Sequence, residues 1–219
     1  LLEKVFVHTP AETYRFAREV LGPLDGAGDR EGCRLEDGQV KTPTGFRDAW
    51  KQLYEAGWKA LGAPVEYGGQ GAPRALTMVA EELLTGANTA FNMYPALTVG
   101  AADLVHAFGT DAQKERYARR MFQGEWAGTM CLTEPDAGSD VGAATTSAKP
   151  LGDGRYAIKG TKIYISGGDH DLTDNIVHLV LARIEGAQPG TKGLSLFVVP
   201  KVRVDDAGNL GEGNDVQVA

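Results

Sequence analysis

The sequence predicts an α+β protein: a helical domain, residues 1–126, followed by an antiparallel β-barrel or sandwich domain, residues 127–219. Before residue 126, apolar residues recur every three or four positions, as on the buried face of a helix. After it, they alternate or form short β-branched runs, and a Leu-Gly-Asp-Gly turn at residues 151–154 separates two of these. We expect the second domain to be incomplete, because an apolar alternation only begins at Val216 and Val218.

The first helix is expected to begin at Thr9-Pro10, where the hydroxyl can cap the helix and Pro suits its first turn. Gly22-Pro23 should end it. Residues 25–43 are rich in Gly and Asp and predict an irregular, exposed connection.

A second helix should begin near Thr44 and bury one face. That face carries Phe46, Ala49, Trp50 and Leu53. The glycine-punctuated residues 57–71 indicate a tight loop to the next helix. They are not a dinucleotide fingerprint, because Gly69-x-Gly71 lacks the third Gly and no strand precedes it.

Three further helices are predicted. Leu76, Ala80 and Leu84 mark one, residues 92–95 (Asn-Met-Tyr-Pro) interrupt, and a strongly apolar helix follows over residues 96–108. The last is capped by Thr110 or Asp111 and closed by Gly124.

The second half predicts successive antiparallel strands. Residues 145–149 and 156–158 flank the Leu-Gly-Asp-Gly turn, and Ile163 and Ile165 alternate with polar neighbours in a further strand. Residues 175–184 and 193–200 are apolar runs joined by a loop with Pro189-Gly190.

The net charge of −7 argues against nucleic acid or an anionic membrane surface as the main partner. The one basic cluster sits on a predicted helix beside Asp111 and Glu115, which favours a solvated helix face. It consists of Lys114, Arg116, Arg119 and Arg120.

Cysteine and hydropathy patterns point to a reducing cytoplasm and away from membrane insertion. Cys33 and Cys131 give neither a disulfide framework nor metal-ligand spacing, so no metal site is predicted. No apolar run approaches the roughly 18 residues that a membrane span needs.

Residues 130–140 organise the chain, because they lie where helices give way to strands. A short apolar run there breaks into Thr, Glu-Pro, Ala-Gly and Ser-Asp. A strand that ends in such a loop can offer several backbone N–H groups to an anionic or polar heterocyclic ligand. An interdomain turn is the other interpretation, since these are also good turn residues.

Several segments together resemble one family. They are Leu-Thr-Glu-Pro at residues 132–135, Gly-Ser-Asp at 138–140, the helix start at 109–117, the loop at 66–71, and Gly-Thr-Lys-Ile-Tyr-Ile-Ser-Gly-Gly at 160–168. The chain is similar to the acyl-CoA dehydrogenase family of flavoproteins over nearly its whole length. The resemblance implies the N-terminal helical and middle β-domains, with the C-terminal four-helix domain absent. Residues 168–172 look most like the branch of 3-methylmercaptopropionyl-CoA dehydrogenases.

The resemblance implies FAD as cofactor, contacted by Met130, Leu132, Thr133, Tyr164, Ile165 and Ser166. Backbone N–H groups near Thr133 would face N1 and the C2 carbonyl of the flavin. The Thr133 hydroxyl would face N5 or the C4 carbonyl. Donors at N1 and C2 stabilise the negative charge of reduced flavin. Tyr164 stands where many members carry Trp, and Ser166 stands where they carry Thr. A β-domain core aromatic and an end-of-strand polar residue are the alternative interpretations of these two.

For the substrate, Ser139 matches the family position that contacts CoA. Tyr94, with Met93, lies near the expected acyl pocket, and the two bulky side chains indicate a short or compact acyl group. The resemblance assigns no catalytic residue to this chain, because the family's carboxylate base belongs to the C-terminal domain. Glu134 and Asp140 are interpreted as loop-building acids that accept hydrogen bonds from backbone donors.

None of the four histidines pairs obviously with a nucleophile or a second histidine. His178 lies within an apolar strand and is expected to be structural. For His170, between Asp169 and Asp171, an exposed loop is the favoured interpretation and ligand binding the alternative.

The leading hypothesis is a fragment, inactive alone, of an FAD-dependent acyl-CoA dehydrogenase that desaturates an acyl-CoA thioester. The resemblance implies an electron-transferring flavoprotein as partner and a homo-oligomer. An oxygen-using member, an acyl-CoA oxidase or flavin monooxygenase, is the first alternative. The second is a non-catalytic relative that binds nucleic acid, which the acidic balance disfavours.

Overall fold

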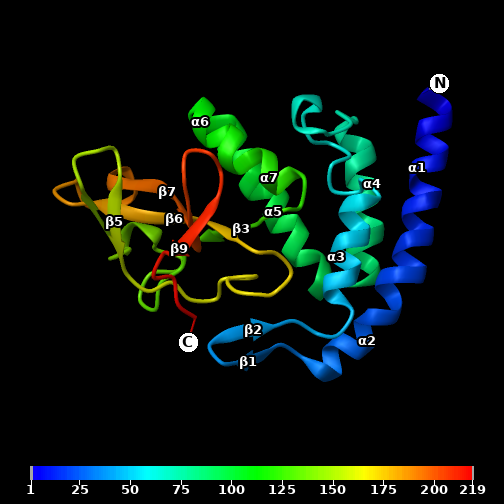
Figure 1. The fold of residues 1–219 in the computed structure, drawn as a ribbon, viewed down its shortest axis with the longest axis horizontal. Coiled ribbons are helices and arrows are strands. Elements are labelled where there is room, and N and C mark those ends of the chain that lie inside the picture. Colours follow the sequence, from blue (N-terminus) through cyan, green and yellow to red (C-terminus); the bar gives the residue numbers. More distant parts are fainter. Residues whose placement is uncertain (1, 219) are drawn as a thin grey trace.

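A computed structural model of the chain describes the backbone of residues 2–218 and the side chains of residues 9–218. Helices gather on one side and the main sheet on the other, and α5 lies beside β3 where the two meet (Figure 1). The helices are α1 Leu2–Phe16, α2 Gly22–Glu31, α3 Phe46–Glu55, α4 Arg74–Ala87, α5 Thr89–Phe108, α6 Asp111–Gln113 and α7 Arg119–Phe122. Single π-helical turns, Ala17–Leu21 and Lys114–Ala118, join α1 to α2 and α6 to α7.

The strands form one larger sheet and two hairpins. Their bounds are β1 Arg34–Glu36, β2 Gln39–Lys41, β3 Ala127–Cys131, β4 Ser147–Pro150, β5 Tyr156–Lys159, β6 Ile176–Ile184, β7 Leu194–Pro200, β8 Val202–Val204 and β9 Leu210–Gly213. The predicted α+β class is confirmed, whereas the strands of the described residues do not close into a barrel.

The N-terminal helix differs from the prediction at both ends. It begins before Thr9 and carries Pro10 inside α1, and Gly22-Pro23 does not stop the chain from being helical. Pro23 lies in the first turn of α2, where no intrahelical N–H donor is needed. Residues 25–43 were expected to be irregular, but they contain most of α2 and the β1–β2 hairpin.

The predicted face of α3 is confirmed, since Phe46, Ala49, Trp50 and Leu53 are all buried. The loop to α4 is as tight as its glycines indicated. A Cβ on Gly69 would lie 2.1 Å from the Ala63 carbonyl oxygen, so no other residue fits there.

The expected break at residues 92–95 is absent from α5, which continues through Pro95. The helix begins instead at Asn88, whose side chain accepts a hydrogen bond from the Phe91 N–H at 2.9 Å. Burial of Phe91, Asn92 and Pro95 against the core outweighs the hydrogen bond that proline cannot donate.

The larger sheet has the order β3-β6-β4-β5, with β7 also pairing with β6. The prediction of successive antiparallel strands is wrong for its centre, because β3 and β4 both pair parallel to β6. The β4–β5 hairpin and the β6–β7 pair are antiparallel, as expected. Ile163 and Ile165 are not in a strand, because the backbone turns at Tyr164 with φ of 58°.

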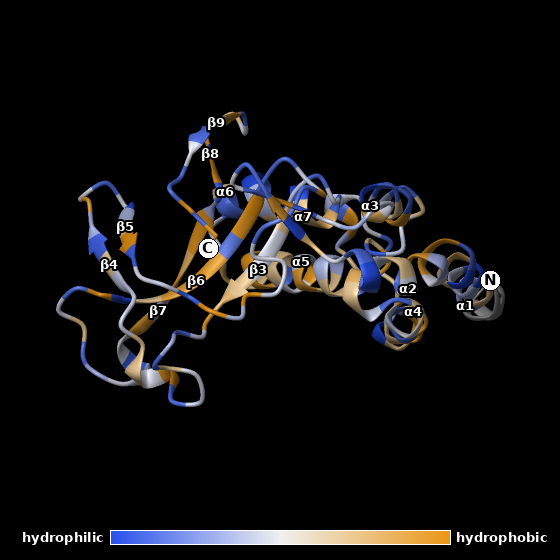
Figure 2. Cartoon of the chain, turned by 90° about the horizontal axis from the view of Figure 1, so that it is seen from below, coloured by the Kyte–Doolittle hydropathy of each residue, from blue (hydrophilic) through white to orange (hydrophobic). Residues whose placement is uncertain are grey.

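The sheet face of β3 and β6 that carries Val177 and Leu179 packs on α5 and α7. The opposite face carries Ala127 and Ile176 and packs against α3 and the start of α5. Hydrophobic residues concentrate along β6 and β7, while the outer loops are hydrophilic (Figure 2). Burial on both faces explains why β6 is a nearly continuous apolar run, interrupted by His178 and Arg183.

The predicted solvated helix face is wrong for two of its arginines. Arg116 pairs with Asp206 at 2.5 Å, and Arg120 donates to the Gly208 carbonyl at 3.2 Å. Both contacts attach the β8–β9 hairpin to the helix. Arg119 remains in the expected helical pair with Glu115.

Candidate flavin-facing site

One edge of β3 is closed by α5. The Thr98 hydroxyl accepts a hydrogen bond from the Gly128 N–H at 3.1 Å and donates to the Tyr94 carbonyl at 2.9 Å. A Cβ on Gly128 would lie 2.6 Å from the Ala101 Cβ, so glycine allows helix and strand to touch. Thr98 was not predicted as a functional residue, although a lone hydroxyl on a strongly apolar helix was a usable signal.

Beyond β3 the strand edge is open. Among the described residues, the N–H groups of Leu132 and Thr133 and the Thr133 hydroxyl have no hydrogen-bond partner. Their carbonyls are occupied, because Lys162 Nζ donates to the Leu132 oxygen at 3.0 Å and the Ile163 N–H donates to the Thr133 oxygen at 2.9 Å. The carbonyls of this segment are therefore engaged while its donors are not, and the bond to Thr133 brings residue 163 alongside.

Tyr164 is 89% exposed and has a left-handed backbone with φ of 58°. The interpretation of Tyr164 as a core aromatic is therefore wrong. An exposed bulky residue in this conformation is strained, and such strain concentrates at ligand sites. Ile165 and Ser166 follow in a turn and are half-buried, and the Ser166 hydroxyl lacks a partner within the described residues.

Glu134 is 4% exposed and builds the loop, as the sequence analysis expected. Its carboxylate accepts from the Thr145 N–H at 2.7 Å and the Thr146 N–H at 3.0 Å, and it pairs with Lys162 at 2.8 Å. Burial alone would raise the pKa of Glu134, but the hydrogen bonds from Lys162, Thr146 and Thr145 outweigh it and hold the pKa far below its usual range. An ionised, fully engaged carboxylate is unsuited to accept a substrate proton.

The two substrate residues lie at different places. Ser139 is exposed in the loop after β3, next to Gly138, whose Cβ position is 3.6 Å from the Thr133 methyl group. Tyr94 is half-buried on α5, with its hydroxyl 3.5 Å from the Cys33 thiol. Met93 beside it is 43% exposed.

The expectation of an exposed loop at His170 is wrong, since His170 is 5% exposed. Its ring packs edge-on against Tyr94, and its Nδ1 accepts from the Leu172 N–H at 3.2 Å. His178 is structural, as expected: it is buried, and its Nδ1 lies 2.7 Å from the Thr129 hydroxyl. Burial lowers the pKa of each imidazole to about 4.

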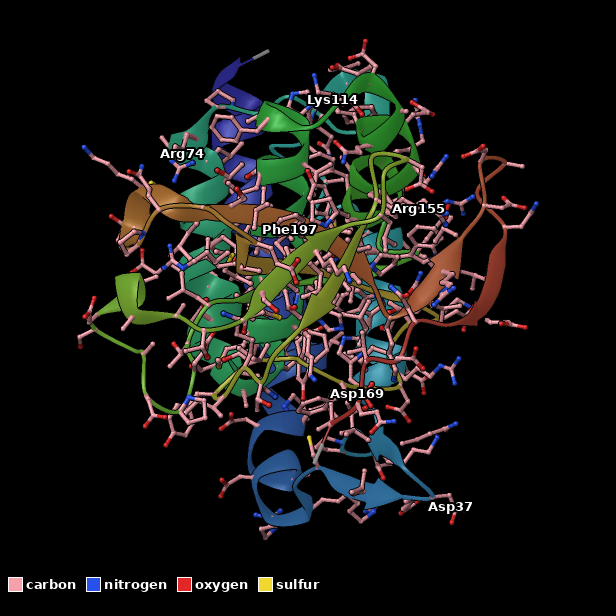
Figure 3. All side chains as sticks on the ribbon, turned by 90° about the vertical axis from the view of Figure 1, so that its left-hand side faces the viewer. Asp37, Arg74, Lys114, Arg155, Asp169 and Phe197 are labelled. Atoms are coloured by element: carbon pink, nitrogen blue, oxygen red, sulfur yellow. The ribbon has the colours of Figure 1, made fainter. Side chains whose placement is uncertain are left out.

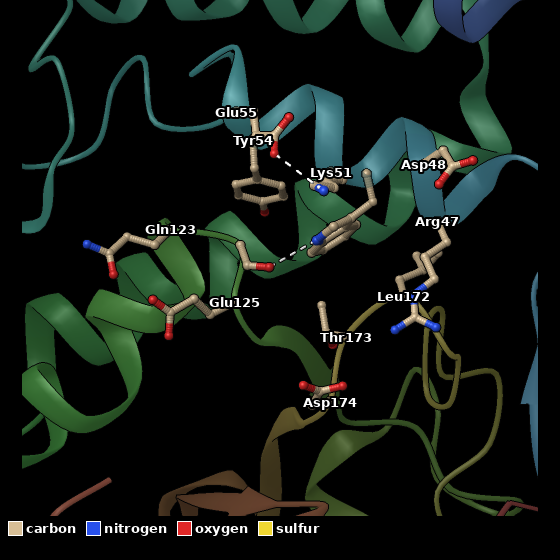
Figure 4. Close-up of a pocket in the computed structure, with 12 residues that line it drawn as sticks. Arg47, Asp48, Lys51, Tyr54, Glu55, Gln123, Glu125, Leu172, Thr173 and Asp174 are labelled. Atoms are coloured by element: carbon tan, nitrogen blue, oxygen red, sulfur yellow. Dashed lines mark hydrogen bonds and ion pairs between the residues drawn. The ribbon is translucent and has the colours of Figure 1, made fainter. Parts of the chain in front are cut away.

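A cavity of about 450 Å³ lies between α3, residues 123–125 and residues 172–174 (Figure 4). Trp50, Tyr54 and Leu172 line it, and the Trp50 indole donates to the Gly124 carbonyl at 3.0 Å. It adjoins the first residues of β3 and β6, whereas Thr133 follows the last residue of β3. The cavity is thus at the far end of the strand from the open donors.

The described part of the chain offers neither a metal site nor a membrane-spanning helix. No group of three His, Cys, Asp or Glu side chains is placed to hold a metal ion. No helix there is both long and apolar enough to cross a bilayer.

The donors of Leu132 and Thr133, the exposed Tyr164 ring and the free Ser166 hydroxyl suit a planar heterocycle with acceptors along one edge. Residues 11–125 match the family described as acyl-CoA dehydrogenase, N-terminal domain, and residues 129–213 match its middle domain. The chain belongs to the acyl-CoA dehydrogenase family. The resemblance inferred from the sequence is confirmed.

The chain is also similar to individual members of the family. The chain is 47% identical over 200 residues to 3-methylmercaptopropionyl-CoA dehydrogenase of Ruegeria pomeroyi, covering 91% of this chain and 34% of that protein. It is 39% identical over 211 residues to butyryl-CoA dehydrogenase of Syntrophomonas wolfei, covering 93% and 34%. Glutaryl-CoA dehydrogenase from Mycobacterium smegmatis superposes with a TM-score of 0.69 at 26% identity, over 89% of this chain and 46% of that one. The chain thus spans about a third of the length of these curated relatives.

Proposed function

We propose that this chain forms the flavin-binding part of an FAD-dependent acyl-CoA dehydrogenase that desaturates the α,β-bond of an acyl-CoA thioester. The observation that carries the proposal is the hydrogen bond from the Ile163 N–H to the Thr133 carbonyl at 2.9 Å. It places the strained, exposed Tyr164 next to a strand end whose donors have no partner among the described residues.

The residues fit an isoalloxazine ring. The N–H groups of Leu132 and Thr133 would donate to its pyrimidine edge, Met130 and Ile165 would flank it, and the Thr133 and Ser166 hydroxyls would reach its polar centre. When bound, FAD accepts the β-hydride of the acyl thioester. Donors aimed at the pyrimidine edge stabilise the negative charge that reduction places there.

For the substrate, we propose that Ser139 contacts the CoA portion and that Tyr94, with Met93, borders the acyl group. The two bulky side chains support a short or compact acyl chain. The α-proton must leave to a base outside these residues, because Glu134 is engaged by Lys162 and backbone donors. We therefore expect no turnover by this chain alone.

Transfer of electrons to an electron-transferring flavoprotein, assembly as a homo-oligomer and a cytoplasmic location belong to the same proposal. Family membership supports the first two. The free thiols Cys33 and Cys131 are compatible with the third.

The test is titration of the purified chain with FAD, followed by quenching of flavin fluorescence and by a shift in the visible absorption bands. We expect saturable binding, with an affinity at least tenfold lower in Thr133→Val, because valine keeps the backbone N–H donor but lacks the hydroxyl donor. Absence of saturable FAD binding contradicts the proposal. A matched control is Thr145→Val, which removes a hydroxyl from the same loop region but one bonded to Glu134 at 2.8 Å.

A further inference from the structure

Three consecutive residues that follow the Tyr164–Ser166 turn are each held by a different element, and we name residues 169–171 the anchor triplet. The first is Asp169, which forms an ion pair with Lys201, directly after β7. The side chain of Asp169 is buried and also accepts from the His170 N–H at 2.9 Å. Figure 3 shows Asp169 on the side of the sheet that faces the β1–β2 hairpin, whose turn carries Asp37.

The second member, His170, is held by the helices. Its ring meets the Tyr94 ring of α5 edge-on, with 5.2 Å between centroids. It also lies beside Trp50 of α3, with 6.3 Å between the ring centroids. The Tyr94 ring also abuts Gly167, since a Cβ there would come within 3.2 Å of it.

The third member, Asp171, is held by the β1–β2 hairpin. Its carboxylate accepts from the Thr42 N–H at 3.0 Å and from the Thr42 hydroxyl at 2.8 Å, and it lies 3.9 Å from Lys41 Nζ. These contacts join segments almost 130 positions apart in the chain. Burial alone would raise the pKa of Asp171, but the hydrogen bonds from Thr42 outweigh it and lower the pKa.

The chain between residues 163 and 168 is therefore fixed at both ends. At one end the Ile163 N–H is bonded to Thr133, and at the other the anchor triplet is held on three sides. The strained backbone of Tyr164 lies between them. A bulky residue keeps a left-handed conformation only where its surroundings enforce it, because the strain otherwise relaxes.

We propose that the anchor triplet positions the Tyr164–Ser166 turn, with Asp171 and the β1–β2 hairpin as its decisive attachment. The turn is thereby held with the Tyr164 ring outward and the Ser166 hydroxyl free for the cofactor. The inference rests on the proposed function for the identity of what the turn faces, but the attachment itself belongs to the chain without any ligand. These residues act through the turn, so they are positioning residues.

The test is hydrogen–deuterium exchange of the flavin-free chain, comparing Asp171→Ala with wild type. Loss of a charged acceptor that holds two Thr42 donors should speed exchange of the amides of residues 163–168 about tenfold, while α3, α5 and β6 keep their protection. The control is Asp174→Ala, which removes the same charge from an exposed position three residues further on. It should exchange like wild type.

Thr42→Val is the milder second variant, because it removes one of the two hydrogen bonds and keeps the side-chain volume. It should accelerate the same amides by a smaller factor. Unchanged exchange at residues 163–168 in both variants overturns the inference, as does a uniform increase over the whole chain. The latter would mean that Asp171 contributes to stability only.

A parallel FAD titration separates this inference from the proposed function. If wild type binds FAD, Asp171→Ala should bind it severalfold more weakly and Asp174→Ala equally well, and equal affinity in Asp171→Ala contradicts positioning toward the cofactor. If wild type binds no FAD, the proposed function fails. The exchange pattern still decides whether the triplet holds the turn.

Discussion

The Thr98 hydroxyl accepts a hydrogen bond from the Gly128 N–H at 3.1 Å, and this contact links α5 to the strand that leads into the segment proposed to face the flavin. Because Thr98 and Gly128 are both buried, water cannot replace either partner. The same hydroxyl donates to the Tyr94 carbonyl at 2.9 Å, so one side chain supports helix and strand together.

Thr98→Val keeps the shape of the side chain but leaves the Gly128 N–H buried without an acceptor. We expect the free energy of unfolding to fall by about 1–3 kcal/mol, measured by urea denaturation. Thr98→Ser retains the hydroxyl and should lose less than the valine variant. Equal losses in the two variants would assign the effect to packing and contradict the role of the hydrogen bond.

Glu134→Gln removes the negative charge that balances Lys162, whose side chain is only 9% exposed. Removing one partner of a buried ion pair is strongly destabilising, so we expect the free energy of unfolding to fall by about 3–5 kcal/mol. The double variant Glu134→Gln with Lys162→Met should recover part of it, because no buried charge is then left uncompensated. Strictly additive losses would show that the two residues are not coupled.

The same ion pair makes the free energy of unfolding depend on pH. The pKa of Glu134 is lowered in the fold, so the unfolded chain binds the proton more readily. Its contribution is therefore complete above the ordinary pKa of about 4.3 and declines as pH falls below that value.

His170 and His178 predict a second loss of stability on acidification, which begins at a higher pH than that of Glu134. Burial lowers both pKa values from 6.5 to about 4, so the unfolded chain takes up these protons first. Stability should fall as pH decreases from about 6.5 to about 4, by about 3 kcal/mol for each imidazole. Urea denaturation across this range measures the slope, and His178→Asn, which cannot titrate there, should reduce it by roughly half. A slope unaffected by this substitution contradicts the prediction.

Tyr164→Gly should separate stability from cofactor binding. Glycine removes the strain of the left-handed backbone, and little packing is lost because the ring is exposed. We therefore expect the free energy of unfolding to rise by about 1 kcal/mol. FAD affinity should fall, because the aromatic plate is gone. Asp37→Gly is the matched control, since Asp37 has φ of 51° in the β1–β2 turn and should gain stability without changing FAD affinity. A lower free energy of unfolding in Tyr164→Gly would contradict the interpretation that the backbone of Tyr164 is strained.

The helices of the first half could be predicted where one face is buried. The spacing of Phe46, Ala49, Trp50 and Leu53 located the core face of α3. Of the two predicted caps, Thr110 and Asp111, the structure has Thr110 as the N-cap of α6, where it forms a capping box with Gln113. Local rules failed where tertiary burial competes with them. Pro10 and Pro95 were expected to mark helix boundaries, yet both lie inside helices.

The sheet was harder, because the alternation of side chains does not state which strand pairs with which. The parallel partners of β6 could not be read from residues 176–184, whose largely apolar run indicates burial on both faces but not direction. Likewise, Ile163 and Ile165 satisfy the pattern of a strand, but the left-handed Tyr164 between them does not. The segments proposed to face FAD were found through family resemblance, whereas Thr98, Lys162 and the anchors of His170 depend on contacts distant in sequence.

The parallel pairing of β3 with β6 has a consequence for folding. Ala127 pairs with Ile176, about fifty residues later, so this ladder cannot form until a large loop has closed. Both segments proposed to face the flavin, around Thr133 and Tyr164, lie within that loop. On a growing polypeptide, α5 to α7 can pack early, because they contact one another and lie close in sequence. The segments proposed to face the flavin must wait for β6 to be synthesised and to dock.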